Sequence, residues 1–420
     1  MRSGNKRSLQ LDFLRGIAIL LVFGRHFEIP RPSGVAGAVG QLWFNVGWLG
    51  VDIFFVLSGF LIGGLLLTEI EAYGKLNIGR FLIRRGLKLY PAYFVFLAYL
   101  ILMPTLKSAL AGTDVLGTFV QYTRSIWPNF FFLQNYLGTT AGHTWTLSVE
   151  EHFYLFLPFA MAALVASGRI QALWSLCLAA VPVFLLLRIL SMFTQDRYSP
   201  YMSATHLRMD ALLIGVAVRG LAHHRGHLFR ALRNWRAPLI AIGILCWIQH
   251  CFILPSTTFI RTIGLTATSL GSAAFLIAAY HTRASDFGPW ARFVTPIASL
   301  FGWIGVYSYT IYLWHVTAMR ILEREFSGRL LSRMGNGPGA YIISIVVVSS
   351  GAILAGVVTA RIIEWPVLKL RDHYFPSRAR TLPAIPSEER YPDPTTSRDI
   401  FAEPPVHSEP DALISGAKAG

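Results

Sequence analysis

Arg15 and His26 are eleven residues apart in the apolar stretch LDFLRGIAILLVFGRHF at 11–27. Because a helix turns about 100° per residue, eleven steps end within about 20° of the same face, about 16 Å along the axis. Histidine titrates near neutral pH and can act as a general base, and a fixed cation can stabilise an oxyanion. Ionisable groups in a membrane helix are costly and indicate a functional site. The alternative is that each side chain extends to a different membrane interface.

Further polar side chains interrupt the apolar stretches of the chain. Asp12 lies three residues before Arg15, a spacing that predicts an ion pair within one helix. The others are Asp52, Ser58, Glu150, Glu151, His152, His206, Arg208, Asp210, Tyr307, Ser308, Tyr309, His315 and Glu364. So many polar groups inside apolar segments predict a polar cavity within a helix bundle.

A cluster of basic residues follows the second long apolar stretch, in GRFLIRRGLKLYPAY at 79–93. We call Arg84, Arg85 and Lys88 the basic cluster, and a short helix in this expected loop would present them on one face. Arginine binds phosphate oxygens bidentately and lysine acts as a point charge, so the cluster predicts a site for a phosphorylated donor. The alternative is the ordinary enrichment of cytoplasmic loops in basic residues.

The composition is that of a membrane protein. The 420 residues are 54% hydrophobic and 14% charged, with a mean hydropathy of +0.49, which excludes an ordinary soluble domain. A net charge of +15 would also suit nucleic-acid binding. Basic loops beside anionic lipid headgroups explain it better, so we expect no nucleic-acid partner. The cysteines match no metal-ligand spacing, and we expect no metal site.

Ten stretches are long enough to cross a bilayer, which takes about 17–25 residues. They lie near 9–27, 43–70, 89–106, 147–166, 172–193, 206–222, 237–254, 260–280, 294–320 and 340–363. The first stretch lacks a small-residue cleavage site and is expected to stay as a membrane helix. The bias of basic residues between alternate loops predicts that both termini are cytoplasmic. We therefore expect an all-α, polytopic membrane helix bundle of about ten transmembrane helices with an internal polar cavity.

Two segments are not expected to span. The connection at 107–146 contains an apolar stretch interrupted by Arg124 and Pro128, which predicts an interfacial or re-entrant segment folded back over the helices. Residues 376–420 are rich in proline, serine and acidic groups and are predicted to form a disordered cytoplasmic tail. Residues 1–375 then form a single transmembrane domain, in which no internal repeat is apparent.

Six segments together resemble the motifs of a known family. They are LDFLRGIAILLVFGRHF, GVDIFFVLSGFLI, RRGLKLYP, TWTLSVEEHFYL, LRMDALLIGV and YSYTIYLWH. In this order the chain resembles the acyltransferase 3 family of membrane O-acyltransferases over about its first 365 residues. The resemblance implies transfer of an acyl group, usually acetyl from acetyl-CoA, onto a hydroxyl group of a carbohydrate or glycosylated acceptor. It implies no bound cofactor, since acyl-CoA is a co-substrate, and a location in the inner cell membrane.

The family motifs assign roles to individual residues. The family's arginine–histidine signature falls on Arg15 and His26. Its basic RxxR motif falls on Arg85 and Lys88, and lysine in place of arginine keeps the charge but loses bidentate geometry. With Arg84, these residues form the expected donor-binding site.

The remaining motifs supply a third catalytic candidate and several supporting residues. The family's Trp-Ser-Leu-x-Val-Glu stretch falls on 145–150, with Thr146 in place of serine and Glu150 at its end. His152 stands where glutamine is common in the family and is assigned no role. Supporting roles fall on Asp52, Ser58, Trp145, Ser148, Arg208, Asp210, Ser308, Tyr309 and His315.

These roles, as the resemblance implies them, combine into the following expected mechanism. Donor phosphates bind the basic cluster, and the thioester enters the bundle from the cytoplasmic face. A neutral His26 takes the proton of the acceptor hydroxyl as general base, and Arg15 stabilises the oxyanion or holds the donor. Glu150 orients His26 or binds the sugar. The alternative function is a secondary transporter or flippase, which buried ionisable groups and basic inner loops would also suit.

Overall fold

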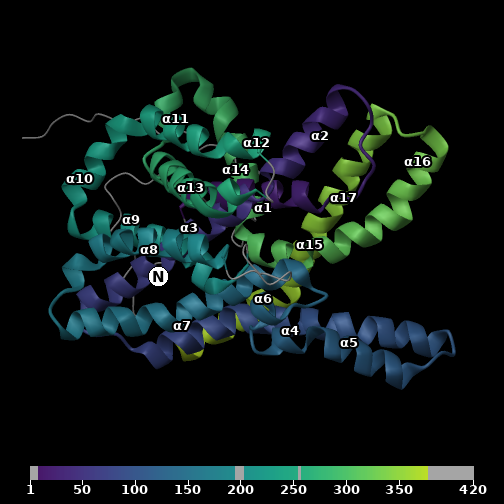
Figure 1. The fold of residues 1–420 in the computed structure, drawn as a ribbon, viewed down its shortest axis with the longest axis horizontal. Helices are drawn as coiled ribbons and strands as arrows, with labels where there is room; N and C mark the ends of the chain where they lie inside the picture. Colours follow the sequence, from purple (N-terminus) through teal and green to yellow (C-terminus); the bar gives the residue numbers. More distant parts are fainter. Residues whose placement is uncertain (1–7, 194–202, 254–256, 377–420) are drawn as a thin grey trace, which may run out of the picture.

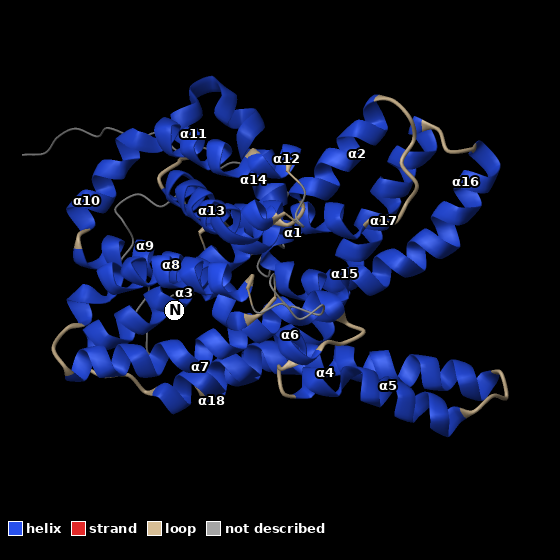
Figure 2. Ribbon diagram, in the orientation of Figure 1, coloured by secondary structure: helices blue, strands red, loops and turns tan. Residues whose placement is uncertain are grey.

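The protein is all helical in the part that the computed structural model describes, which covers residues 8–193, 203–253 and 257–376. These residues form helices joined by turns and contain no strand (Figures 1 and 2). The predicted all-α fold class is confirmed. The predicted tail at 376–420 lies, apart from Pro376, outside the described residues.

The longer helices make up most of the fold and follow one another along the chain (Figure 1). They are α1 (Leu9–His26), α2 (Val35–Val46), α3 (Leu49–Tyr73), α4 (Ile78–Leu110), α5 (Val115–Phe130), α7 (Trp145–Ala166), α8 (Leu173–Ser191), α9 (Thr205–His224), α11 (Arg236–Trp247), α13 (Leu265–Tyr280), α14 (Ala291–Val306), α15 (Ser308–Leu322), α17 (Pro338–Thr359) and α18 (Trp365–Tyr374). Shorter helical segments are α6 (Gln134–Leu137), α10 (Gly226–Ala231), α12 (Gln249–Phe252) and α16 (Gly328–Met334).

Seven helical segments in the described residues are long and apolar enough to cross a membrane, judged by length and composition. They are Val35–Tyr73, Ile78–Leu110, Gly142–Ala166, Ile170–Ser191, Gly226–Phe252, Ile260–Tyr280 and Pro338–Tyr374. The predicted count of ten is therefore not reproduced by this criterion. Helix α1 falls outside the set because it contains Asp12, Arg15 and Arg25. A multi-pass membrane protein is nevertheless the architecture that these segments indicate.

The predicted span at 294–320 is not one continuous helix. Helix α14 ends at Val306, and α15 begins at Ser308 after Tyr307 leaves helical geometry at φ −98°, ψ 5°. Helix α14 packs along α1, whereas α15 packs along α17. The change of direction at Tyr307 therefore moves the chain from one partner helix to another.

The basic cluster lies on a long helix rather than in a loop. Helix α4 begins at Ile78, where the Asn77 side chain accepts a hydrogen bond of 3.0 Å from the Arg80 backbone N–H, and it continues to Leu110. Helix α5 packs back along the second half of α4, and the pair extends beyond the rest of the bundle (Figure 1). The apolar stretch predicted to be interfacial or re-entrant thus begins as a helix that doubles back on α4.

Glycines allow the helices that carry the candidate residues to approach closely. A Cβ atom on Gly305 of α14 would lie 1.8 Å from the Asp12 carbonyl oxygen, and one on Gly16 would lie 2.0 Å from the Phe301 carbonyl oxygen. Between α3 and α9, a Cβ on Gly59 would lie 1.9 Å from the Leu212 carbonyl oxygen. Small residues at helix crossings are typical of membrane bundles, where backbones pack directly. These contacts position α1 and α3 beside the cavity described next.

Candidate active site

A polar cavity of about 110 Å³ lies among helices α1, α3, α4, α7, α14 and α15 and the helical segment Ala360–Glu364, which follows α17. Its polar lining consists of Arg15, Ser58, Arg85, Lys88, Thr146, Glu150, Ser308, Tyr309, Tyr312 and Glu364. Apolar side chains of α3, including Phe54 and Phe55, line the rest of its wall. The internal polar cavity predicted from the sequence is therefore present, and it collects residues from five of the six family-like segments.

Cations outnumber carboxylates in the cavity wall. Arg15, Arg85 and Lys88 face Glu150 and Glu364. Arg15 also forms the ion pair predicted from sequence, with its Nη1 3.1 Å from Asp12 Oδ1. Asp12 is buried, with 5% of its surface exposed. The excess of positive charge can therefore attract an anionic group to the cavity. The carboxylates in and beside the wall offset part of the repulsion among the cations.

Tyr154 holds Arg85 against the cavity. The Arg85 guanidinium donates a hydrogen bond to the Tyr154 hydroxyl and lies 4.1 Å above its ring centroid. The same hydroxyl is 2.5 Å from the Ser58 hydroxyl oxygen, so α3, α4 and α7 meet at one phenol. Sequence reasoning assigned Ser58 and Arg85 but missed Tyr154. Its signal was its position one helical turn after Glu150, on the same face of α7.

Arg84 points to a different partner from Arg85 and Lys88. Its Nη2 lies 3.2 Å from Asp372 Oδ1, and its Nη1 donates to the Phe375 carbonyl oxygen. Asp372 lies in the last turn of α18 and Phe375 directly follows this helix, and Arg84 is not part of the cavity lining. The structure therefore brings Arg85 and Lys88 together in the cavity and places Arg84 in an ion pair beside it.

His26 lies in a cluster of three histidines next to the cavity. We call His26, His143 and His315 the histidine cluster. The ring centroids of His26 and His315 are 4.9 Å apart, those of His143 and His315 are 5.3 Å apart, and those of His26 and His143 are 6.4 Å apart. His315 was a supporting residue in the sequence prediction, whereas His143 was missed because it precedes the matched stretch at 145–150.

Tyr312 connects the cavity to the histidine cluster. It lines the cavity, and its ring centroid is 5.4 Å from that of His315. Its hydroxyl donates a 2.6 Å hydrogen bond to the His143 carbonyl oxygen and accepts a 2.8 Å hydrogen bond from Thr146. The contacts from the cavity to His26 therefore pass through the ring of Tyr312 and then through that of His315.

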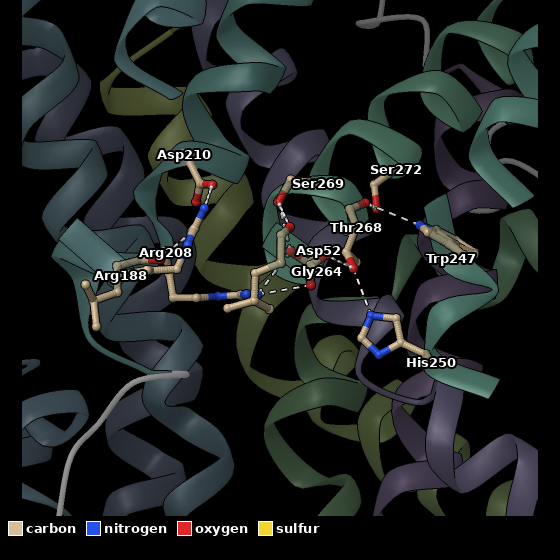
Figure 3. Close-up of polar contacts among 12 residues, drawn as sticks. Asp52, Arg188, Arg208, Asp210, Trp247, His250, Gly264, Thr268, Ser269 and Ser272 are labelled. Atoms are coloured by element: carbon tan, nitrogen blue, oxygen red, sulfur yellow. Dashed lines mark hydrogen bonds and ion pairs between the residues drawn. The ribbon is translucent and has the colours of Figure 1, made fainter. Parts of the chain in front are cut away.

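Three other predicted residues belong to a separate buried network (Figure 3). Arg208 Nη2 lies 3.0 Å from both carboxylate oxygens of Asp52, and Arg188 Nη2 lies 2.8 Å from Asp210 Oδ2. The four side chains are at most 3% exposed. None of them lines the cavity. The Arg208 guanidinium lies 5.8 Å from the Trp145 ring centroid, so this network touches the start of α7.

The last supporting residues divide between cavity and core. Ser308 and Tyr309 line the cavity, and the Tyr309 hydroxyl donates a 2.6 Å hydrogen bond to the Leu89 carbonyl oxygen. Ser148 is fully buried, and its hydroxyl has no hydrogen-bond partner among the described residues. Within the same residues, no group of three or more histidine, cysteine, aspartate or glutamate side chains is arranged to hold a metal ion.

Comparison with known proteins places these features in a family. The family model described as "Acyltransferase domain" matches residues 8–361. The chain is 27% identical over 343 residues to the peptidoglycan O-acetyltransferase OatA of Listeria monocytogenes, covering 75% of this chain and 50% of that protein. It is 24% identical over 378 residues to the O-acetyltransferase OatA of Staphylococcus aureus, covering 86% of this chain and 57% of that protein. The chain thus spans about half the length of these curated relatives. No solved structure matches.

Proposed function

Because the chain belongs to the acyltransferase 3 family, we propose that it is an integral membrane O-acetyltransferase. Its donor is acyl-CoA, with acetyl as the transferred group, and its acceptor is a hydroxyl group of a carbohydrate. The name of the Listeria relative makes a peptidoglycan-type glycan the first acceptor to test. The protein lies in the cell membrane with both termini in the cytoplasm.

The cavity that Arg85 and Lys88 line, and that adjoins the histidine cluster at Tyr312, is the observation that carries this proposal. Along α15, Tyr309 contacts the carbonyl of Leu89, Tyr312 follows one turn later, and His315 follows one turn after that. Six residues of helix correspond to about 9 Å along the axis. A donor whose phosphates rest on Lys88 and Arg85 can therefore place its thioester near Tyr312, at the edge of the histidine cluster.

The reaction follows from these positions. Arg85 and Lys88 in the cavity bind phosphate oxygens of the donor. Arg84 adds less to donor binding because Asp372 partly neutralises its charge. The oxygen of the acceptor hydroxyl attacks the thioester carbonyl carbon while neutral His26 accepts the proton of that hydroxyl. The carbon–sulfur bond then breaks, and the proton passes from His26 to the departing thiolate. Arg15, about 16 Å along α1 from His26, helps to hold the donor in the cavity, and Glu150 of the cavity wall binds the acceptor.

Ester formation from radiolabelled acetyl-CoA in reconstituted membranes tests the proposal. We expect His26→Ala to lower kcat by about 10²–10⁴-fold, the usual contribution of a general base. Arg85→Ala should raise KM for acetyl-CoA by about tenfold, since it removes a charge-assisted phosphate contact. Arg84→Ala is the matched comparison and should raise that KM less. Activity that survives His26→Ala, or solute uptake without ester formation, would overturn the assignment.

A further inference from the structure

The tautomer of His315 is set by its own helix. Its Nδ1 lies 2.5 Å from the Tyr312 carbonyl oxygen, three residues earlier in α15. Because a carbonyl oxygen only accepts, Nδ1 carries the hydrogen and Nε2 of the neutral ring is an acceptor. The ring is fully buried, and Nε2 has no hydrogen-bond partner in the described part of the chain. A buried acceptor without a donor is costly, so Nε2 indicates a contact that is made at some stage of the reaction.

His143 has the opposite tautomer to His315, and its single N–H already donates to a backbone carbonyl. Its Nε2 lies 3.1 Å from the Leu313 carbonyl oxygen, so Nε2 carries the hydrogen and Nδ1 is the acceptor of the neutral ring. In the neutral rings of His315 and His143, the only N–H group therefore donates to a backbone carbonyl and is not available to His26. The neutral His26 ring holds the remaining N–H, and its centroid is nearer to His315, at 4.9 Å, than to His143, at 6.4 Å.

The His315 ring is held in place on its other side. Phe23 of α1, three residues before His26, stacks on it with a centroid separation of 5.7 Å and an interplanar angle of 18°. The rings of His26 and His315 meet edge to face, with an interplanar angle of 70° and their centroids 4.9 Å apart. At this centroid separation, an N–H of one ring can reach a nitrogen of the other after a small rotation. Hence His315 is the rigid member of the pair and His26 is the one that adjusts.

We propose that His315 is a positioning residue for His26, whose ring N–H it accepts at Nε2. This inference rests on the proposed function, in which His26 is the general base. With one nitrogen donating to His315, the other nitrogen of His26 carries the lone pair that removes the proton from the acceptor hydroxyl. While that proton resides on His26, the imidazolium keeps its hydrogen bond to His315. The proton then leaves from the same nitrogen to the thiolate of CoA, and His315 neither gains nor loses a proton.

Three substitutions at His315 separate positioning from packing. In His315→Gln, the amide oxygen can occupy the place of Nε2. In His315→Asn, the shorter amide reaches only the place of Nδ1, and in His315→Leu no acceptor is left. We expect kcat to fall by about 10–100-fold in the leucine and asparagine variants, the loss of a hydrogen bond to a charged group. The glutamine variant should regain most of the rate, and KM for acetyl-CoA should stay within about twofold.

The pH profile provides a readout that a packing role would not move. Without His315 as acceptor, the protonated form of His26 is less stable, so the acidic limb of kcat should shift toward lower pH by about one unit. His250→Leu is the matched control, because His250 is also buried. One of its ring nitrogens is hydrogen-bonded to Thr268, and the other has no partner among the described residues. It should leave both kcat and the pH profile near those of the natural protein.

The outcomes distinguish the inference from the function on which it rests. If His26→Ala abolishes ester formation while His315→Leu keeps the natural kcat and pH profile, the positioning role alone is overturned. If the His26→Ala variant stays active, both the general-base role of His26 and the positioning role of His315 are overturned. Should the leucine variant fail to fold, judged by size-exclusion chromatography in detergent, the comparison rests on glutamine against asparagine. A faster glutamine variant supports the inference, and equal rates contradict it.

Discussion

The hydroxyl group of Tyr312 donates a 2.6 Å hydrogen bond to the carbonyl oxygen of His143, 169 residues away in the chain. The same hydroxyl accepts from Thr146, which stands where the family motif has serine. Tyr312 lines the cavity and also packs on His315. One phenol thus orders the boundary between the two parts of the candidate active site.

Removing this hydroxyl should impair turnover more than donor binding. In Tyr312→Phe the ring stays, but the Thr146 hydroxyl and the His143 carbonyl lose a buried partner, which costs about 1–3 kcal/mol. We expect kcat for ester formation to fall about tenfold, with KM for acetyl-CoA changed by less than about threefold.

A double-mutant cycle checks that the two hydroxyls act together. Thr146→Val should lower kcat less than Tyr312→Phe, which also removes the hydrogen bond to the His143 carbonyl. The double variant should be little worse than Tyr312→Phe, because both single changes remove the Thr146–Tyr312 hydrogen bond. Thr146→Ser keeps the hydroxyl and is the control. Additive losses in the double variant would mean that the two side chains act independently.

Local helix geometry explains what the sequence predicts correctly about the site. The Asp12–Arg15 pair follows from a spacing of three within one helix, and the two cations at positions 85 and 88 share a face for the same reason. The surroundings of His26 could not be predicted in this way. His143 and His315 come from distant segments. The packing of α1 against α15 brings His315 to His26, and the hydrogen bond from His143 to the Leu313 carbonyl oxygen of α15 places His143 beside both. The break at Tyr307 likewise depends on which helices α14 and α15 pack against.

The approach of α3 to α9 should be sensitive to a single methyl group at Gly59. A Cβ there would lie 1.9 Å from the Leu212 carbonyl oxygen, so the helices must separate. We expect Gly59→Ala to lower the free energy of unfolding by about 2 kcal/mol or more, as overpacking does. Thermal unfolding of the purified protein in detergent measures the effect.

Gly63 provides the matched control on the same face of α3. A Cβ there would lie 3.5 Å from Val216, an ordinary contact distance. Gly63→Ala should be neutral or stabilising by up to about 1 kcal/mol, because alanine favours the helix over glycine. Equal destabilisation by both substitutions would show that the crossing is not limited by backbone contact.

The Asp52–Arg208 pair should contribute to folding rather than to the chemical step. Both side chains are almost fully buried, and Ser269 donates a further 3.2 Å hydrogen bond to Asp52. Asp52→Ala leaves an uncompensated buried cation and should destabilise the protein by about 3–5 kcal/mol. Replacing the pair by Asp52→Leu with Arg208→Met should recover much of the loss. The measurements are the yield of monodisperse protein and kcat per folded molecule, and a well-folded but inactive double variant would argue for a direct catalytic role.

Glu323 should make the stability of the protein depend on pH. It begins a short helical segment (Glu323–Ser327) after α15, and its Oε1 accepts a 3.2 Å hydrogen bond from the Glu28 backbone N–H. Burial, with the nearby Glu28 carboxylate, raises the pKa of Glu323 from 4.5 to about 7, against the opposing effects of that hydrogen bond and of Arg320. Between these two values the folded protein holds a proton that the unfolded chain releases.

The free energy of unfolding should therefore fall as pH rises from about 5 to 7 and level off above it. Since Glu323 is only half-buried, the total change is on the order of 1 kcal/mol. Glu323→Gln keeps an acceptor for the Glu28 N–H and should remove this slope, so that the variant gains stability relative to the natural protein as pH rises. Glu325→Gln is the matched control, because Glu325 is an exposed neighbour that pairs with Arg329 at 3.2 Å. Melting temperatures across this pH range decide the matter: an unchanged slope in Glu323→Gln would assign the pH dependence to other groups.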